Sequence, residues 1–117
     1  MALTREQIKA KRGVRPRVAV EVPELGTVYV AKFSAKDRDR FEQMVTGGRV
    51  GGNVNLDNVR ARFVAMVCVN EDGTRMFEDG DAEWIGELDT DIVQTIVDAG
   101  FKLNGIGVNA VEEAAGK

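Results

Sequence analysis

The apolar stretch from residue 58 to residue 69 constrains the fold more than any other part of the chain. Val59, Phe63 and Met66 recur at intervals of about one turn of an α-helix, so their side chains share one face. From residue 64 onward the stretch is apolar on every side, as in a helix that other elements cover all round. We therefore predict a central core helix over residues 58–69.

Residues 17–22 and 27–31 predict the two strands of a β-hairpin. In each segment valines alternate with other residues, so that Val20 and Val28, for example, lie on the apolar faces of their strands. The Pro-Glu-Leu-Gly sequence at residues 23–26 supplies the turn between them. A two-stranded hairpin is only marginally stable in water, so we expect helices to cover its apolar face.

Capping residues and apolar stripes predict further helices. Thr4 and Gln7 have the spacing of a capping box, which begins a short helix that ends near Arg12. Ser34 caps a helix that runs to Thr46. The expected caps and apolar faces of the last two helices are Asp79 or Asp81 with Trp84, Ile85 and Leu88, and Asp89 or Thr90 with Ile92, Val93, Ile96, Val97 and Phe101.

Together these elements predict an α+β fold, a mostly helical single domain with an N-terminal β-hairpin packed against about four helices. A turn at Asp72 and Gly73 returns Met76 and Phe77 beneath the central helix. The expected divisions of the chain are a basic N-terminal arm with a short helix (residues 1–16), a globular α+β domain (17–106) and a flexible C-terminal tail (107–117).

Charge is distributed unevenly along the chain. Residues 1–17 hold six basic residues and one acidic residue, whereas the whole chain has a net charge of -3. A basic arm can bind nucleic acid by releasing counterions from phosphates. This arm has no aromatic side chain for stacking, and the acidic remainder would repel phosphate, so we expect no nucleic-acid binding. We expect instead that the arm pairs with the acidic residues 78–91 and that the protein forms a homo-oligomer.

The sequence offers few residues for catalysis or for cofactor binding. It has no histidine, which removes the commonest general base and the usual zinc ligand. Cys68 is the only cysteine and lies within the apolar stretch. The glycine-rich residues 47–53 lack the pattern of a phosphate-binding loop and are predicted to be a linker, and the acidic clusters around Gly73 and Gly80 miss the register of a calcium loop. We therefore predict a non-enzymatic protein without a metal or other cofactor.

Apolar runs in this chain are short. The longest uninterrupted run, residues 63–69, falls far below the ~20 residues that span a bilayer. The first residues also lack the apolar core of a signal peptide. We therefore expect a cytoplasmic protein that does not bind membranes.

The order of these elements and several short strings resemble the tail assembly chaperones of long-tailed (siphovirus-type) bacteriophages. The resembling strings are residues 3–8 (LTREQI), 20–30 (VEVPELGTVYV), 34–42 (SAKDRDRFE), 58–69, 71–77 (EDGTRMF), 103–105 (LNG) and 111–113 (VEE). The resemblance depends on their order along most of the chain, since each string uses turn and capping residues that many folds share. The glycine-rich residues 47–53 depart from the pattern.

The resemblance implies an assembly factor that binds the tape measure protein, keeps it soluble and promotes assembly of the tail tube protein around it. It also implies action in the host cell cytoplasm, absence from the mature virion and, often, a longer form made by ribosomal frameshifting. A permanent structural subunit, such as a head-tail connector or a tail terminator, is the alternative. The apolar residues expected to contact a partner are Met44, Val45, Val50, Val54, Leu56, Ile106, Val108 and Val111.

Overall fold

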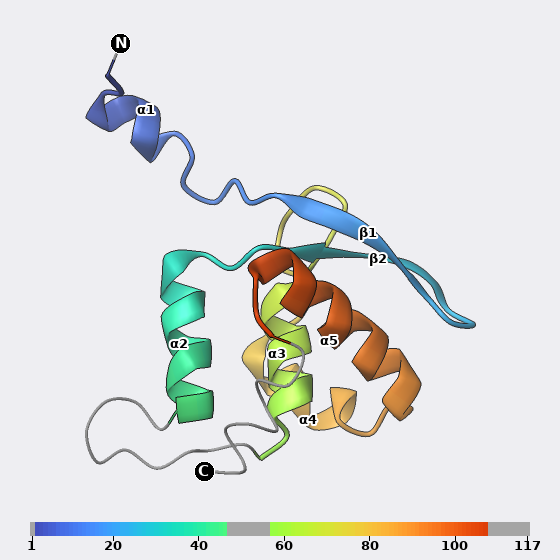
Figure 1. Cartoon of the computed structure of the whole chain (residues 1–117). Coiled ribbons are helices and arrows are strands. Elements are labelled where there is room, and N and C mark those ends of the chain that lie inside the picture. Colours follow the sequence, from blue (N-terminus) through green and yellow to red (C-terminus); the bar gives the residue numbers. More distant parts are fainter. Residues whose placement is uncertain (1, 47–56, 108–117) are drawn as a thin grey trace.

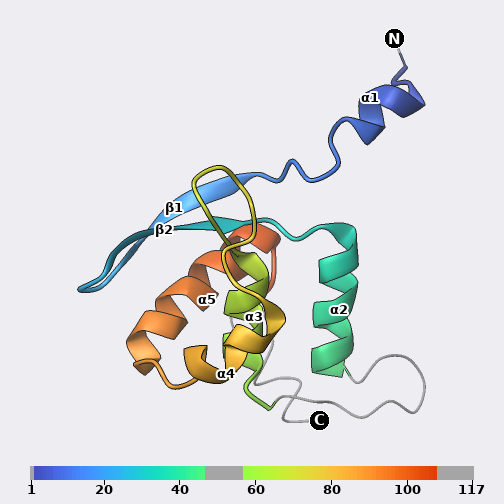
Figure 2. The ribbon, with the colours of Figure 1, turned by 180° about the vertical axis from the view of Figure 1, so that it is seen from behind.

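The computed structural model describes residues 2–46 and 57–107, which form an α+β fold, as the sequence predicts. In chain order the elements are α1 (Arg5–Lys9), β1 (Arg17–Val22), β2 (Gly26–Ala31), α2 (Ala35–Thr46), α3 (Val59–Val67), β3 (Cys68–Val69), the 3-10 turn η1 (Asp79–Asp81), α4 (Ala82–Ile85) and α5 (Thr90–Asn104). Helices α2 to α5 lie on one side of the sheet, whereas α1 projects away from the body (Figure 1, Figure 2). The predicted hairpin therefore covers a helical layer.

The sheet has a third strand that the sequence analysis did not predict. β1 and β2 form the expected antiparallel hairpin, and β3 pairs antiparallel with β2, with Cys68 opposite Val30. The prediction that the central helix continues to residue 69 is wrong, because α3 ends at Val67. The spacing of apolar residues could not show where the helix ends, because the residues before and after this boundary are all buried from 63 to 69. A short apolar run of this kind fits either a helix or a strand.

The chain reverses after β3 through a hydrogen-bonded turn. The N–H of Asn70 donates to the carbonyl oxygen of Thr74 at 2.7 Å, and the N–H of Thr74 donates to the Asp72 carboxylate at 2.9 Å. Beyond the turn, Phe77 packs against the core as expected, but Met76 is 40% exposed. Only one residue of the predicted apolar pair therefore packs against the core, and Phe77 is itself half-buried.

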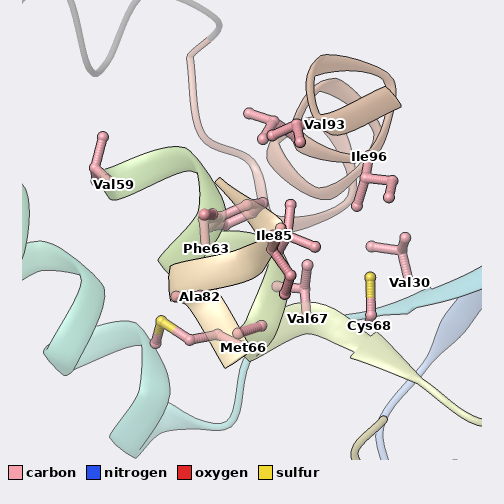
Figure 3. Close-up of a cluster of buried hydrophobic side chains, with 14 of the residues drawn as sticks. Val30, Val59, Phe63, Met66, Val67, Cys68, Ala82, Ile85, Val93 and Ile96 are labelled. Carbon is pink, nitrogen blue, oxygen red and sulfur yellow. The ribbon is translucent and has the colours of Figure 1, made fainter. Parts of the chain in front are cut away.

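The core is built around α3, which is the predicted central helix. The ring of Phe63 lies edge to face with three others, at centroid distances of 4.9 Å to Phe101, 5.3 Å to Phe41 and 5.5 Å to Phe33. Gly100 allows α5 to approach this closely, since a Cβ atom there would lie 2.5 Å from the Phe63 ring. Figure 3 shows Met66 extending from α3 toward α2. Helices on several sides of α3 thus explain why its sequence is apolar all round.

Most of the predicted helix starts are present. Thr4 and Gln7 form the capping box of α1, although this helix ends at Lys9. Asp89 caps α5 with its side chain. Asp81 occupies the N-cap position of α4, as predicted, but its side chain makes no cap hydrogen bond there. It instead forms a capping box with Glu78 at the start of η1, the turn that leads into α4. This arrangement leaves the neighbouring Asp79 side chain for other contacts.

Candidate functional site

The predicted partner-contact residues within the described structure are Met44, Val45 and Ile106. Val45 is buried in the core, and Met44 is half-buried on the same helix, α2. Ile106 is half-buried after α5, where its N–H donates to the carbonyl oxygen of Phe101 at 2.8 Å. The remaining predicted contacts lie outside the described residues: Val50, Val54, Leu56, Val108 and Val111. The three described side chains therefore support the core and do not form an exposed apolar surface.

The hollow beside Met44 has a volume of about 380 Å³, and charged and polar side chains line it together with two methionines. On its edge, the Asp79 carboxylate accepts hydrogen bonds from Arg75 Nη2 at 2.5 Å and from Arg40 Nη2 at 3.0 Å. These bonds, chiefly the one from Arg75, lower the pKa of Asp79. Two guanidinium groups on one carboxylate tie α2 to η1, so these ion pairs hold the fold together at this place.

An apolar groove lies between the tip of the hairpin and helices α4 and α5, with a volume of about 290 Å³. Apart from Gly26 and Thr27, its lining residues are large apolar side chains or Cys68. They comprise the fully buried Val64, Cys68 and Ile85 at its floor, Val22, Val28, Phe77, Ile92, Val93 and Ile96 in its walls, and Leu25, Trp84 and Leu88 at its rim. We call this feature the hairpin-tip groove.

Three large apolar side chains are exposed around the hairpin-tip groove: Leu25 is 69% exposed, Trp84 46% and Leu88 39%. The prediction that Trp84 and Leu88 pack inward with Ile85 is wrong, since only Ile85 is fully buried. The cause is the length of α4 (Ala82–Ile85), a single turn that can direct only one side into the core. Single exposed apolar residues are ordinary on a protein surface, whereas three around one hollow make this groove the candidate binding site.

The indole of Trp84 is fixed at its polar edge. Its Nε1–H donates to Asp81 Oδ1 at 2.9 Å, and the Phe77 ring lies edge to face with it at a centroid distance of 5.6 Å. The bond from Trp84, together with one from the N–H of Glu78, lowers the pKa of Asp81. Because the N–H of the indole is already satisfied, the exposed part of the ring is free for apolar contacts.

No acidic side chain lines the hairpin-tip groove, but the segments that form it are acidic. The segments that build its walls and rim, residues 18–31 and 76–101, contain no lysine or arginine. Exposed carboxylates adjoin the apolar side chains in the sequence: Glu24 next to Leu25, Glu83 next to Trp84, Glu87 next to Leu88 and Asp91 next to Ile92. An apolar hollow with this surround suits an amphipathic segment whose polar side is basic.

Cys68 lies on the floor of the groove, beside Val30 of the neighbouring strand (Figure 3). Burial raises the pKa of its thiol to about 12, so the thiol is protonated at neutral pH and is a poor nucleophile. Among residues 2–46 and 57–107, no three His, Cys, Asp or Glu side chains cluster in a way that could hold a metal ion. Apolar contact is therefore the chemistry that the lining of the groove offers.

Within the same described segments, no helix has both the length and the apolar character needed to cross a membrane. No known protein family, no curated protein and no solved structure matches this chain. Any role of the hairpin-tip groove must therefore be inferred from its shape and lining and from the sequence itself.

Proposed function

We propose that this chain is a tail assembly chaperone of a long-tailed bacteriophage and that it binds the tape measure protein through the hairpin-tip groove. The observation that carries the proposal is the gathering of exposed Leu25, Trp84 and Leu88 around one apolar hollow. A tape measure protein is a long, largely helical chain with apolar stripes, which aggregate unless a partner covers them. A groove that takes one face of a helix covers such a stripe.

The acidic segments that form the groove suit a temporary partner. Each bound copy would add negative charge to the tape measure protein, which opposes aggregation of the complex. The groove is small, so each contact is weak, and release when tail tube subunits replace the chaperone costs little free energy. Many weak contacts along one long client explain how it stays soluble yet remains available for assembly.

The order of the strings along the sequence supports the same proposal. It spans most of the chain, from residues 3–8 to residues 111–113, and includes the hairpin whose tip forms one wall of the groove. The proposal places the protein in the host cell cytoplasm during assembly and outside the mature virion. It requires no bond to be made or broken, in keeping with a sequence that has no histidine and a thiol that burial keeps protonated.

The proposal is tested by co-expression with the phage tape measure protein, followed by measurement of its soluble fraction. We expect the wild-type chain to raise the soluble fraction and the Leu25→Glu variant to lose this effect. Met76→Glu is the matched control, because Met76 is also exposed but does not line the groove. A tape measure protein that stays equally insoluble with and without the wild-type chain contradicts chaperoning.

Mass spectrometry of purified virions separates the chaperone from a permanent subunit. A chaperone is absent from finished particles. A head-tail connector or tail terminator would instead be present in the copy number of a ring, and that result would replace the proposed function with the structural one.

A further inference from the structure

Helix α1 projects from the body and buries none of its side chains (Figure 1). Leu3 is 72% exposed and Ile8 is 60% exposed. Thr4 is the N-cap of α1, so Leu3 comes just before the cap and Ile8 four residues after it. At a capping box, side chains in these two positions pack together on one side of the helix. A helix of one to two turns is not stable alone in water, so α1 needs a surface against which to pack.

The base of the arm is fixed at the end of the sheet that is remote from the groove. Arg15 Nη1 donates to the carbonyl oxygen of Lys32 at 3.1 Å and lies 3.6 Å from the Asp37 carboxylate in α2. The N–H of Lys32 also donates to the carbonyl oxygen of Pro16 at 2.9 Å. Since β1 runs from this point to the tip, α1 and the hairpin tip lie at opposite ends of the hairpin (Figure 1, Figure 2). The arm is thus presented to another molecule.

The arm and the groove are complementary in both charge and apolar character. The helix and the turn after it contain Arg5, Lys9, Lys11 and Arg12 against a single acidic residue, Glu6. The side chains that line the groove are uncharged, whereas the segments that supply its walls and rim, residues 18–31 and 76–101, contain acidic residues but no lysine or arginine. An amphipathic basic segment is the partner that such a groove selects, and this chain carries one.

We propose that the arm of one copy docks in the hairpin-tip groove of a second copy, with Leu3 and Ile8 inserted between the rim residues Leu25 and Trp84. The groove, at about 290 Å³, has roughly twice the ~150 Å³ of an apolar cavity that accepts benzene, so it has room for two such side chains. The basic side chains of the arm then face segments that carry exposed carboxylates and no basic side chain.

This contact gives the groove an occupant of its own before a client arrives. The inference shares with the proposed function only the premise that the groove binds an amphipathic segment, and it names a different partner. The contact is small and partly ionic, so it is weak and weakens further as salt rises. A client that fills the groove better displaces the arm, which makes self-association and client binding mutually exclusive.

Sedimentation velocity of the pure chain tests the inference without any tape measure protein. We expect association that increases with protein concentration and decreases with salt. Ile8→Glu should lower the association constant about tenfold or more, since it removes the burial of a large apolar side chain and adds a like charge. Ala10→Glu is the matched control, because it adds the same charge to the arm without removing a large side chain, and it should have a smaller effect.

A mixing experiment shows whether the contact joins an arm to a groove. Ile8→Glu keeps an intact groove and Leu25→Glu keeps an intact arm, so each alone should be monomeric while an equimolar mixture forms a heterodimer. Both residues are exposed, and circular dichroism should show both variants folded. Trp84 is the only tryptophan, so its emission should change on mixing.

Three results would overturn the inference. The first is a wild-type chain that remains monomeric at low salt and high concentration. The second is association that Ile8→Glu leaves unchanged. The third is a monomer whose Trp84 emission responds to Ile8→Glu, which would mean that each arm fills its own groove. None of these results bears on whether the chain solubilises a tape measure protein.

Discussion

The contact between α3 and α5 and the hairpin-tip groove are built from similar apolar side chains, but only the first is filled by the chain itself. Phe63 and Phe101 meet edge to face over Gly100 and leave almost no exposed surface. Around the groove, Leu25 and Trp84 remain exposed and a hollow of about 290 Å³ separates the surrounding elements. Apolar side chains that pack against each other stabilise the fold, whereas apolar side chains without an internal partner are available for binding.

Phe63→Ala should have the largest effect on stability. Loss of this central ring leaves a cavity among the other aromatic side chains, which costs about 3–5 kcal/mol of unfolding free energy. The rim substitution Trp84→Ala should cost less than about 1.5 kcal/mol, since half of that side chain is already exposed. Urea unfolding followed by circular dichroism measures both. Similar losses at the two sites would remove the distinction between core and groove.

Gly100→Ala should also destabilise the core, although alanine favours helices. The added methyl group would meet the ring of Phe63 at 2.5 Å, and overpacking of this kind costs about 1–3 kcal/mol against a gain of about 1 kcal/mol in helix propensity. Gly80→Ala is the control, because no atom lies within 4 Å of the new methyl group. A Gly100→Ala variant as stable as wild type would show that α3 and α5 pack less closely than described.

Glu24→Gly should stabilise the hairpin tip. Glu24 has a φ of 68°, in the left-handed region that glycine adopts without steric cost. Relief of this strain should raise the unfolding free energy by up to about 1 kcal/mol, whereas Glu24→Ala, which keeps the Cβ atom, should not. Thermal unfolding of the two variants makes the comparison. A glycine variant less stable than the alanine variant would argue against this backbone conformation at the tip.

The fluorescence of Trp84 at the rim of the groove should change with pH only below about pH 4. The hydrogen bond from the Trp84 indole lowers the pKa of Asp81, so the carboxylate interaction is fully present above the ordinary aspartate pKa of about 3.9 and is lost as the pH falls through the lower folded value. Trp84 emission should therefore stay constant from pH 7 to about pH 5 and change only below about pH 4. Asp81→Asn is the control and should flatten this transition. An emission change centred near pH 6 would mean that another group controls the indole.

Much of the fold follows from local sequence signals. The hairpin follows from alternating valines, and α1 and α5 follow from the capping side chains of Thr4 and Asp89. The strand β3 could not be predicted in this way, because Cys68 and Val69 become extended only through pairing with β2. Tertiary hydrogen bonds, which no periodicity records, decided the end of the central helix.

The groove was harder to predict from the sequence than the core. An apolar stripe shows which side chains avoid water, but it does not show whether other parts of the chain cover them. The single turn of α4 buries Ile85 but leaves Trp84 and Leu88 exposed. Val45, which was predicted to contact a partner, is instead buried, because α2 directs its side chain into the core. One signal was present: Leu25 is a large apolar residue in a turn between a glutamate and a glycine.

The most direct test of binding at the hairpin-tip groove is a fluorescence titration of Trp84 with a tryptophan-free amphipathic segment of the phage tape measure protein. We expect a saturable change in emission for wild type and for Met76→Glu, and loss of both the change and the binding for Leu25→Glu. A segment that binds all three chains equally well, as measured by sedimentation, without altering Trp84 emission would contradict the claim that the hairpin-tip groove is the binding site.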